Sequence, residues 1–230
     1  MIIYGRNPVR EALRGRRAVE QVWATPKTAR LDWLSGVDVE IVDGGAVEAR
    51  AGSPEHQGIA ARVAPYPYAD AAELLAQPDP LIVALDQITD PHNLGAICRT
   101  AEVVGATGVV IPERRSADVT PAVVKASAGA VEHLPVARVR NLADFLGDAK
   151  QAGSWVYGAS GGATTRYDQP DYTGGVVLVL GAEGEGLRPR VAAACDDLVA
   201  LPRRGRVESL NVSAAAAALL YEMLQRREPA

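Results

Sequence analysis

Residues 81–85 read Leu-Ile-Val-Ala-Leu, an unbroken apolar run of the kind found in strands buried on both faces. Similar runs recur at residues 108–111, 155–157, 176–180 and 198–201. Helical patterns lie between or after them, at residues 94–104, from Thr120-Pro121 onward, at 142–151 and at 211–225. Strands that alternate with helices form parallel sheets covered on both faces, so we expect an α/β domain here. Ligands then belong at the carboxyl ends of the strands.

A smaller α/β unit is expected before this domain. Apolar runs at residues 19–24, 37–42 and 58–63 alternate with short helical patterns near 27–34 and 46–51. Asn7-Pro8 looks like a helix N-cap followed by a proline in the first turn. Four prolines between residues 64 and 80 interrupt regular structure. We therefore expect a small domain over residues 1–66, a linker over 67–80 and the larger domain over 81–230.

The composition is that of a globular protein, with 230 residues of which 48% are apolar and 23% charged. No window approaches the roughly 18 consecutive apolar residues that a membrane helix needs, and the N-terminus lacks the build of a signal peptide. We expect a cytoplasmic protein with no membrane partner. Cys98, Cys195 and three histidines have no metal-ligand spacing, so we expect no metal either.

Charge is unevenly distributed along the chain. The net charge of −4 counts against binding nucleic acid by bulk electrostatics, because that binding relies on clustered Lys and Arg. Residues 1–30 are nevertheless rich in arginine, and Arg203, Arg204 and Arg206 form a second basic run. For each cluster, a phosphate-binding patch and an ordinary solvated surface are both open at this point.

Residues 181–186 read Gly-Ala-Glu-Gly-Glu-Gly and directly follow the apolar run at 176–180. Glycines at the end of a strand allow backbone to approach a ligand closely. The segment is not a phosphate-binding P-loop, which needs Lys and then Ser or Thr where this chain has Leu187-Arg188. By itself, the segment is more typical of a tight turn between a strand and a helix.

Residues 158–162 read Gly-Ala-Ser-Gly-Gly and match the G-x-S-x-G nucleophile elbow of serine hydrolases. A hydrolase is therefore an alternative function for this chain. An elbow must open a helix, but residues 163–175 have no helical periodicity. The catalytic triad of that fold also needs a histidine after the serine, whereas the last histidine is His133. We therefore expect a turn at Ser160.

Three segments, residues 86–101, 178–187 and 207–213, resemble the successive motifs of the SpoU (TrmH) family of RNA 2′-O-methyltransferases in order, content and spacing. The resemblance covers about residues 81–230. Residues 4–9 and 55–59 resemble the small substrate-binding domain of the members that methylate a guanosine of 23S ribosomal RNA, a domain similar to ribosomal protein L30e.

The resemblance implies a SPOUT-type domain, in which a parallel sheet carries a trefoil knot, that acts as a homodimer on RNA with S-adenosylmethionine as cofactor. General rules would not predict a knot, since threaded chains are very rare. The substrate implied is 23S ribosomal RNA. Transfer RNA, and a noncatalytic RNA-binding protein on the same fold, are the alternatives.

The family's motif positions also imply roles for individual residues. Arg99 takes the catalytic position, where a guanidinium, which keeps its proton, would stabilise the developing alkoxide and grip phosphate. The other residues that would position the ribose or orient Arg99 are Asn93, Glu183, Ser209 and Asn211. The cofactor contacts would be Gly181, Leu201 and Leu210, and the candidate RNA contacts are Arg6, Arg10, Arg203, Arg204 and Arg206.

Several of these residues also have a structural interpretation. Asn93 and Ser209 would serve as helix caps, and Glu183 would favour a helix N-terminus. The two leucines would be ordinary core residues. Retention of the polar motif residues together favours an enzyme over a noncatalytic protein.

Overall fold

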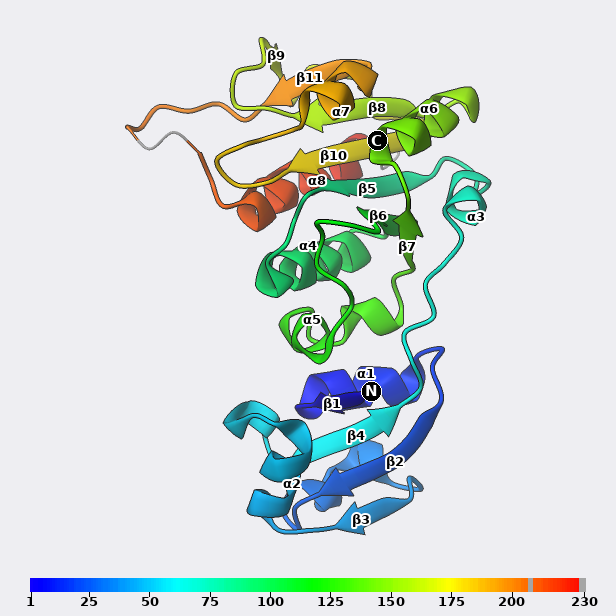
Figure 1. The fold of residues 1–230 in the computed structure, drawn as a ribbon, viewed down its shortest axis with the longest axis vertical. Helices are drawn as coiled ribbons and strands as arrows, with labels where there is room; N and C mark the ends of the chain where they lie inside the picture. The colour runs from blue at the N-terminus through cyan, green and yellow to red at the C-terminus, as the bar shows by residue number, and fades with distance from the viewer. Residues whose placement is uncertain (207–208, 228–230) are drawn as a thin grey trace.

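The computed structural model describes residues 1–206 and 209–227, which form two α/β units stacked along the long axis of the molecule (Figure 1). The small unit contains the N-terminus and the large unit contains the rest of the chain after residue 80. Within the described residues, no helix is long and apolar enough to cross a membrane.

The large unit is built on a sheet of parallel strands, as the sequence predicts. The sheet has the order β7-β6-β5-β10-β8-β11-β9. Its strands are β5 (Leu81–Asp86), β6 (Gly108–Pro112), β7 (Val136–Val139), β8 (Trp155–Ala159), β9 (Thr165–Arg166), β10 (Val176–Gly181) and β11 (Asp197–Ala200). β5 and β10 pair at the centre, with Leu81 opposite Val176 and Asp86 opposite Gly181. The trefoil knot stays a prediction.

Side chains alternate between two cores because successive residues of a strand point to opposite faces. On β5, Leu81, Val83 and Leu85 join one core and Ile82 and Ala84 the other. The first core includes residues of α4 (Pro91–Val103) and α8 (Val212–Arg227), with α5 (Pro121–Ala126) packed on α4. The second includes residues of α3 (Ala71–Leu75), α6 (Leu142–Gln151) and α7 (Pro189–Ala194).

The small unit is a four-stranded sheet with the order β1-β4-β2-β3. Its elements are β1 (Ile2–Tyr4), α1 (Arg6–Arg14), β2 (Val19–Ala24), β3 (Val39–Ile41), α2 (Gly44–Ala51), β4 (Ile59–Val63) and the short 3₁₀ helices Thr28–Arg30, Asp32–Leu34 and Pro54–His56. The expected N-cap at Asn7 is wrong. The cap is Gly5, whose φ of 97° favours glycine, and Asn7 lies inside the first turn of α1.

The segment 67–80, which we expected as a linker, also contributes to the large unit. It contains α3, and the Ala69 amide donates a hydrogen bond to the Val136 carbonyl at 2.9 Å. Ala69 also forms a parallel bridge with Ala137 of β7. The chain between the two sheets is therefore fastened to the edge of the large sheet.

A buried ion pair joins the two units. Arg17, which follows α1, binds Glu132, which ends the 3₁₀ helix η4 (Ala130–Glu132). Its Nε lies 2.8 Å from Glu132 Oε2, and a second guanidinium nitrogen donates to Oε1. Both side chains are almost completely buried, at 1% and 0% exposure.

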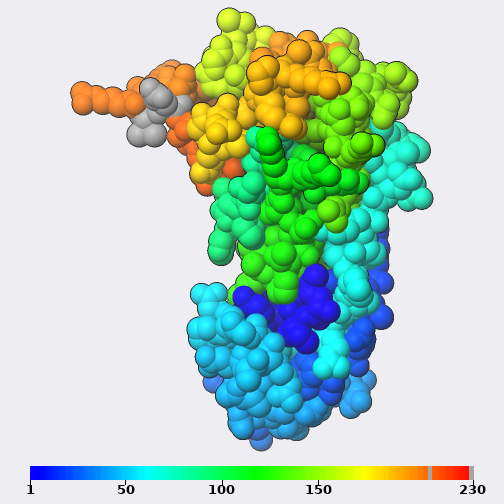
Figure 2. Space-filling view, viewed as in Figure 1, coloured from blue at the N-terminus to red at the C-terminus, as the bar shows by residue number. Residues whose placement is uncertain are grey.

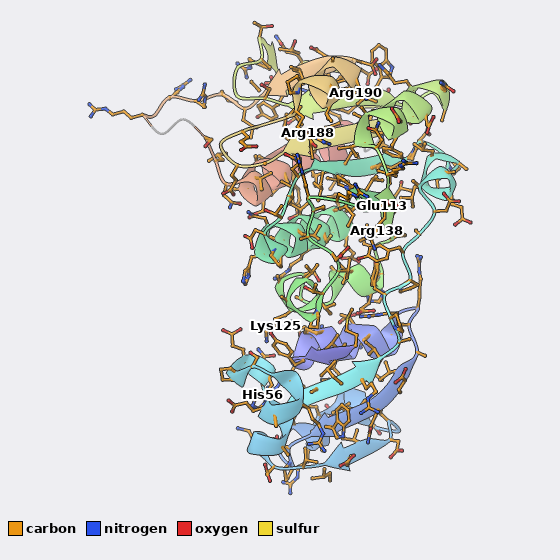
Figure 3. All side chains as sticks on the ribbon, in the orientation of Figure 1. His56, Glu113, Lys125, Arg138, Arg188 and Arg190 are labelled. Carbon is orange, nitrogen blue, oxygen red and sulfur yellow. The ribbon has the colours of Figure 1, made fainter. Side chains whose placement is uncertain are left out.

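Further polar contacts cross the same junction. The Tyr66 hydroxyl donates to the Val131 carbonyl at 3.1 Å, and Glu11 lies 3.0 Å from His133 Nε2. Lys125, labelled on α5 in Figure 3, donates to the Glu55 carbonyl at 2.8 Å. One apolar core also runs through the junction, from Ile3 and Val9 to Val124. The two units therefore pack against each other along a shared interface.

Replacement of Arg17 by alanine should strongly destabilise the protein. The variant leaves the Glu132 carboxylate buried without its partner, a change that typically costs about 3–5 kcal/mol. Urea denaturation should show this as a lower free energy of unfolding. The control is the double variant Arg17→Met with Glu132→Leu, which removes both charges and should recover most of the loss. Arg17→Ala with unchanged unfolding would contradict this role.

Candidate functional site

Three of the predicted site residues meet in one hydrogen-bonded cluster. Asn93 lies on α4, Glu183 on the loop after β10, and Asn211 just before α8. Asn211 Nδ2 donates to Glu183 Oε1 at 2.5 Å and to Asn93 Oδ1 at 2.9 Å. Asn93 Nδ2 donates to the same Glu183 oxygen at 3.2 Å. Segments that are 90 and 118 residues apart in sequence are thereby joined at one place.

The hydrogen bonds show which of these residues lie at helix N-termini. Asn211, immediately before α8, accepts from the Ser213 amide at 2.8 Å, which is N-cap geometry, while Ser209 is exposed two residues earlier. Helix α4 is capped by Asp90, so Asn93 is not its cap. Glu183 does meet a helix N-terminus, because its Oε1 also accepts from the Val212 amide at 3.3 Å. The Asn93 side chain is therefore free of a capping role and hydrogen bonds to Glu183 and Asn211 instead.

Gly181 ends β10 and is required by its own loop. A Cβ at this position would lie 2.2 Å from the Gly186 carbonyl carbon, far inside contact distance. The Gly186 amide donates to the Ala182 carbonyl at 2.9 Å, which closes the turn. Gly184 and Gly186 have φ of 80° and 71°, values that favour glycine. The tight-turn interpretation of residues 181–186 is thus confirmed, and the backbone nearest Gly181 belongs to the loop itself.

A second ion pair, which the sequence did not reveal, fixes the end of this loop. Asp86, the last residue of β5, is fully buried. Its Oδ1 accepts from Arg188 Nε at 2.7 Å, and its Oδ2 accepts from the Arg188 amide at 2.9 Å. The one available signal was a carboxylate at the end of an apolar strand, because such a buried charge needs a partner. The loop is therefore held at Gly181 by the sheet and at Arg188 by Asp86.

Arg99 is exposed on α4, as its place outside the apolar series predicts. It lies six residues beyond Asn93, about 9 Å along the helix axis, and makes no hydrogen bond or ion pair with the described residues. Its neighbour Cys98 is fully buried, and burial raises the pKa of that thiol to about 12. Cys98 is therefore no thiolate nucleophile at neutral pH. Arg99 stays outside the cluster, with its guanidinium open to solvent.

The two leucines predicted as cofactor contacts have different surroundings. Leu201 follows β11 and packs, partly buried, against the core of the large unit. Leu210 is 57% exposed, so it is not a core residue. Residues 203–206, which precede it in the chain, project from the body of the molecule in Figure 2. Val207 and Glu208 of the third motif lie outside the described residues.

The candidate RNA contacts lie in two separate places. In the small unit, Arg6 Nε donates to the Gln57 carbonyl at 3.4 Å, and Arg10 Nε lies 2.7 Å from Glu11 Oε1, which offsets part of its charge. In the large unit, Arg203 donates to the Gly161 carbonyl at 3.0 Å. Arg204 and Arg206 are exposed beside it.

Two other kinds of site find no support. Ser160 lies in a turn, where the Ala163 amide donates to its carbonyl at 3.2 Å, and the next element is the strand β9. A nucleophile elbow would open a helix there. In the part of the chain that the structure describes, no group of three or more His, Cys, Asp or Glu side chains could hold a metal ion.

Replacement of Asp86 by asparagine should loosen the loop. The side chain keeps its shape but loses the charge that accepts two Arg188 hydrogen bonds. Loss of one charge-assisted bond, here with a half-exposed partner, should speed hydrogen exchange of the Gly186 and Arg188 amides at least about tenfold. Asp168→Asn, which disrupts an exposed pair with Arg166, is the control and should leave these amides unchanged. Unchanged protection in Asp86→Asn would refute the anchoring role.

Two family models match successive parts of the chain. The SpoU rRNA Methylase family matches residues 80–221, and the family described as RNA 2′-O ribose methyltransferase substrate binding matches residues 2–69. A TrmH family tRNA/rRNA methyltransferase from Bacillus subtilis is 39% identical over 99% of this chain and 96% of its own length.

Two further proteins are similar over almost the whole chain. A protein from Synechocystis named as an uncharacterized tRNA/rRNA methyltransferase is 41% identical over 98% of this chain, which spans 62% of that longer protein. The crystal structure of an AdoMet-bound rRNA methyltransferase from Sinorhizobium meliloti superimposes with a TM-score of 0.83 at 27% identity, covering 97% of this chain and 86% of that one. This chain therefore belongs to the SpoU (TrmH) family of RNA 2′-O-methyltransferases.

Proposed function

We propose that this protein transfers a methyl group from S-adenosylmethionine to the 2′-oxygen of a guanosine in 23S ribosomal RNA, in the cytoplasm. The observation that carries the proposal is the Asn93–Glu183–Asn211 cluster, which joins the three motif segments at the carboxyl end of the sheet. A ribosomal substrate is favoured because residues 80–221 match the SpoU rRNA Methylase family and the S. meliloti relative is an rRNA methyltransferase. Transfer RNA is the alternative, since both curated relatives carry the name tRNA/rRNA methyltransferase.

The residues predicted as cofactor contacts suit this cofactor. S-adenosylmethionine supplies an electrophilic methyl group on a sulfonium, attached to an adenosine that needs apolar surface and main-chain polar groups. Leu201 at the end of β11 and the exposed Leu210 offer apolar surface. The ordered turn after Gly181 offers main chain at the end of β10. These three residues would hold the cofactor.

Glu183 is suited to orient the ribose. Its Oε1 accepts hydrogen bonds from Asn93, Asn211 and the Val212 amide, which fix the carboxylate in place. Its Oε2 has no partner among the described residues, so it can accept a hydrogen bond from a ribose hydroxyl. A hydroxyl held in this way can be aligned with the methyl group, and alignment supplies a large part of the rate of a bimolecular reaction.

Arg99 is suited to stabilise charge. A guanidinium keeps its proton, so Arg99 does not remove the proton of the 2′-hydroxyl. It can donate two parallel hydrogen bonds to a phosphate or to the oxygen that becomes negative during transfer. Its exposure and its freedom from partners within the described residues leave it available for this contact.

Replacement of Arg99 by alanine should lower single-turnover methylation of 23S ribosomal RNA at least about 10²-fold, the usual scale for losing one such donor. Arg99→Lys should restore little, because an ammonium cannot form the bidentate contact. Calorimetric titration should show nearly unchanged cofactor affinity. Arg226→Ala, which removes another exposed arginine of the large unit, is the control. Near-normal turnover in Arg99→Ala would refute the assignment, and unfolding would make Arg99 a structural residue.

A homodimer is part of the proposal. The family resemblance implies one, and Tyr221 on α8 is a large apolar side chain with 47% exposure that a partner subunit could cover. Light scattering at low micromolar concentration should give about twice the chain mass of 24.2 kDa. A stable monomer with full activity would contradict this expectation.

A further inference from the structure

A large hollow at the carboxyl ends of β6 and β7 is lined by six arginines. Its volume is about 1110 Å³, and α6 and α7 form part of its wall. The arginines are Arg114, Arg115, Arg138, Arg140, Arg188 and Arg190, and we call this hollow the arginine pocket. Three of them are labelled in the upper unit in Figure 3. In a chain of net charge −4, six of the 24 lysines and arginines are thus gathered around one concave surface.

Half of these arginines are held in place by other side chains. Arg188 binds the buried Asp86, and Arg190 lies 3.3 Å from Asp144. Arg138 stacks over the Tyr68 ring at 5.0 Å and lies 3.6 Å from Asp118. Their partners therefore offset much of their charge but also order the wall of the pocket.

The other half have no such partner. Arg114, Arg115 and Arg140 are exposed and form no hydrogen bond or ion pair with the described residues. The acidic side chains of the lining are Asp70, Asp144 and Asp148. Asp70 already caps α3, and Asp144 faces Arg190. Uncompensated cations in a concave surface focus a positive field, which attracts anions.

We propose that the arginine pocket binds the sugar–phosphate backbone of the RNA substrate. This inference rests on the proposed function and adds a binding surface separate from Arg6, Arg10 and the run at 203–206. Guanidinium groups bind phosphate through two parallel hydrogen bonds, so a set of arginines suits a chain of phosphates. The six arginines come from three separate segments and line one continuous hollow, which suits several phosphates of a polymer more than a single small anion.

The position of the pocket relates it to the candidate site. Arg188 lines the pocket and also anchors, through Asp86, the loop that carries Glu183. RNA phosphates bound in the pocket would therefore contact the structure that positions the Asn93–Glu183–Asn211 cluster. A backbone contact of this kind fixes the register of the RNA but does not read its sequence.

The double variant Arg114→Ala with Arg140→Ala tests the proposal, because neither side chain has a partner among the described residues whose loss would disturb the fold. Filter binding to transcribed 23S ribosomal RNA should show at least tenfold weaker affinity. The slope of log affinity against log salt should fall by about 0.7–0.9 for each lost phosphate contact. The control, Lys150→Ala with Arg226→Ala, removes two positive charges elsewhere in the large unit, both of them in ion pairs with carboxylates, and should bind like the wild type.

Several outcomes would overturn the proposal. If the wild type binds RNA and methylates it, but the double variant has the same affinity and salt slope, the pocket does not contact RNA and the proposed function survives. If the control loses as much affinity for RNA as the double variant, the loss reflects the total positive charge of the protein and not the arginine pocket. If pyrophosphate binds with the same arginine dependence while RNA binding is unchanged, the pocket serves a small phosphorylated ligand. A wild type that binds neither RNA nor S-adenosylmethionine refutes the proposed function itself.

Discussion

The pairing of β5 with β10 at the centre of the large sheet is the constraint on which the candidate site depends. This pairing places Asp86 directly opposite Gly181 at the carboxyl end of the sheet. Asp86 is buried there with its charge, and Arg188 compensates it. The loop between Gly181 and Arg188 must therefore turn back tightly, and it presents Glu183 to Asn93 and Asn211. The Asp86–Arg188 ion pair thus helps to position the Asn93–Glu183–Asn211 cluster. The packing of apolar side chains alone would not fix the place of these polar side chains.

The small unit is held firmly against the large unit. The buried Arg17–Glu132 pair and the shared core mean that the two units present one continuous structure to a substrate. Arg6 on α1 and the arginine pocket of the large unit are then fixed relative to each other. Such an arrangement suits an acidic protein that binds structured RNA through local basic patches and shape instead of a uniformly positive surface.

The sequence predicts the parts of the fold that have strong patterns. The runs at 81–85 and 176–180 are buried strands because they are apolar throughout, and α6 has the expected bounds. The edge strand β7 escaped prediction because Arg138 interrupts its short apolar pattern. In the site, motif resemblance selected Asn93, Glu183 and Asn211, but no local pattern could pair Asp86 with Arg188 across 102 residues. The arginine pocket could not be predicted either, because its arginines come from three segments that are far apart in the sequence.

We propose that this geometry directs a methyl group to a ribose oxygen of ribosomal RNA. Mass spectrometry of nucleosides tests it most directly, after incubation of the purified protein with S-adenosylmethionine and 23S ribosomal RNA from cells that lack it. We expect one new 2′-O-methylguanosine per RNA molecule, formed only when the cofactor is present. Methylation on a base instead of the ribose, or no added methyl group, would contradict it.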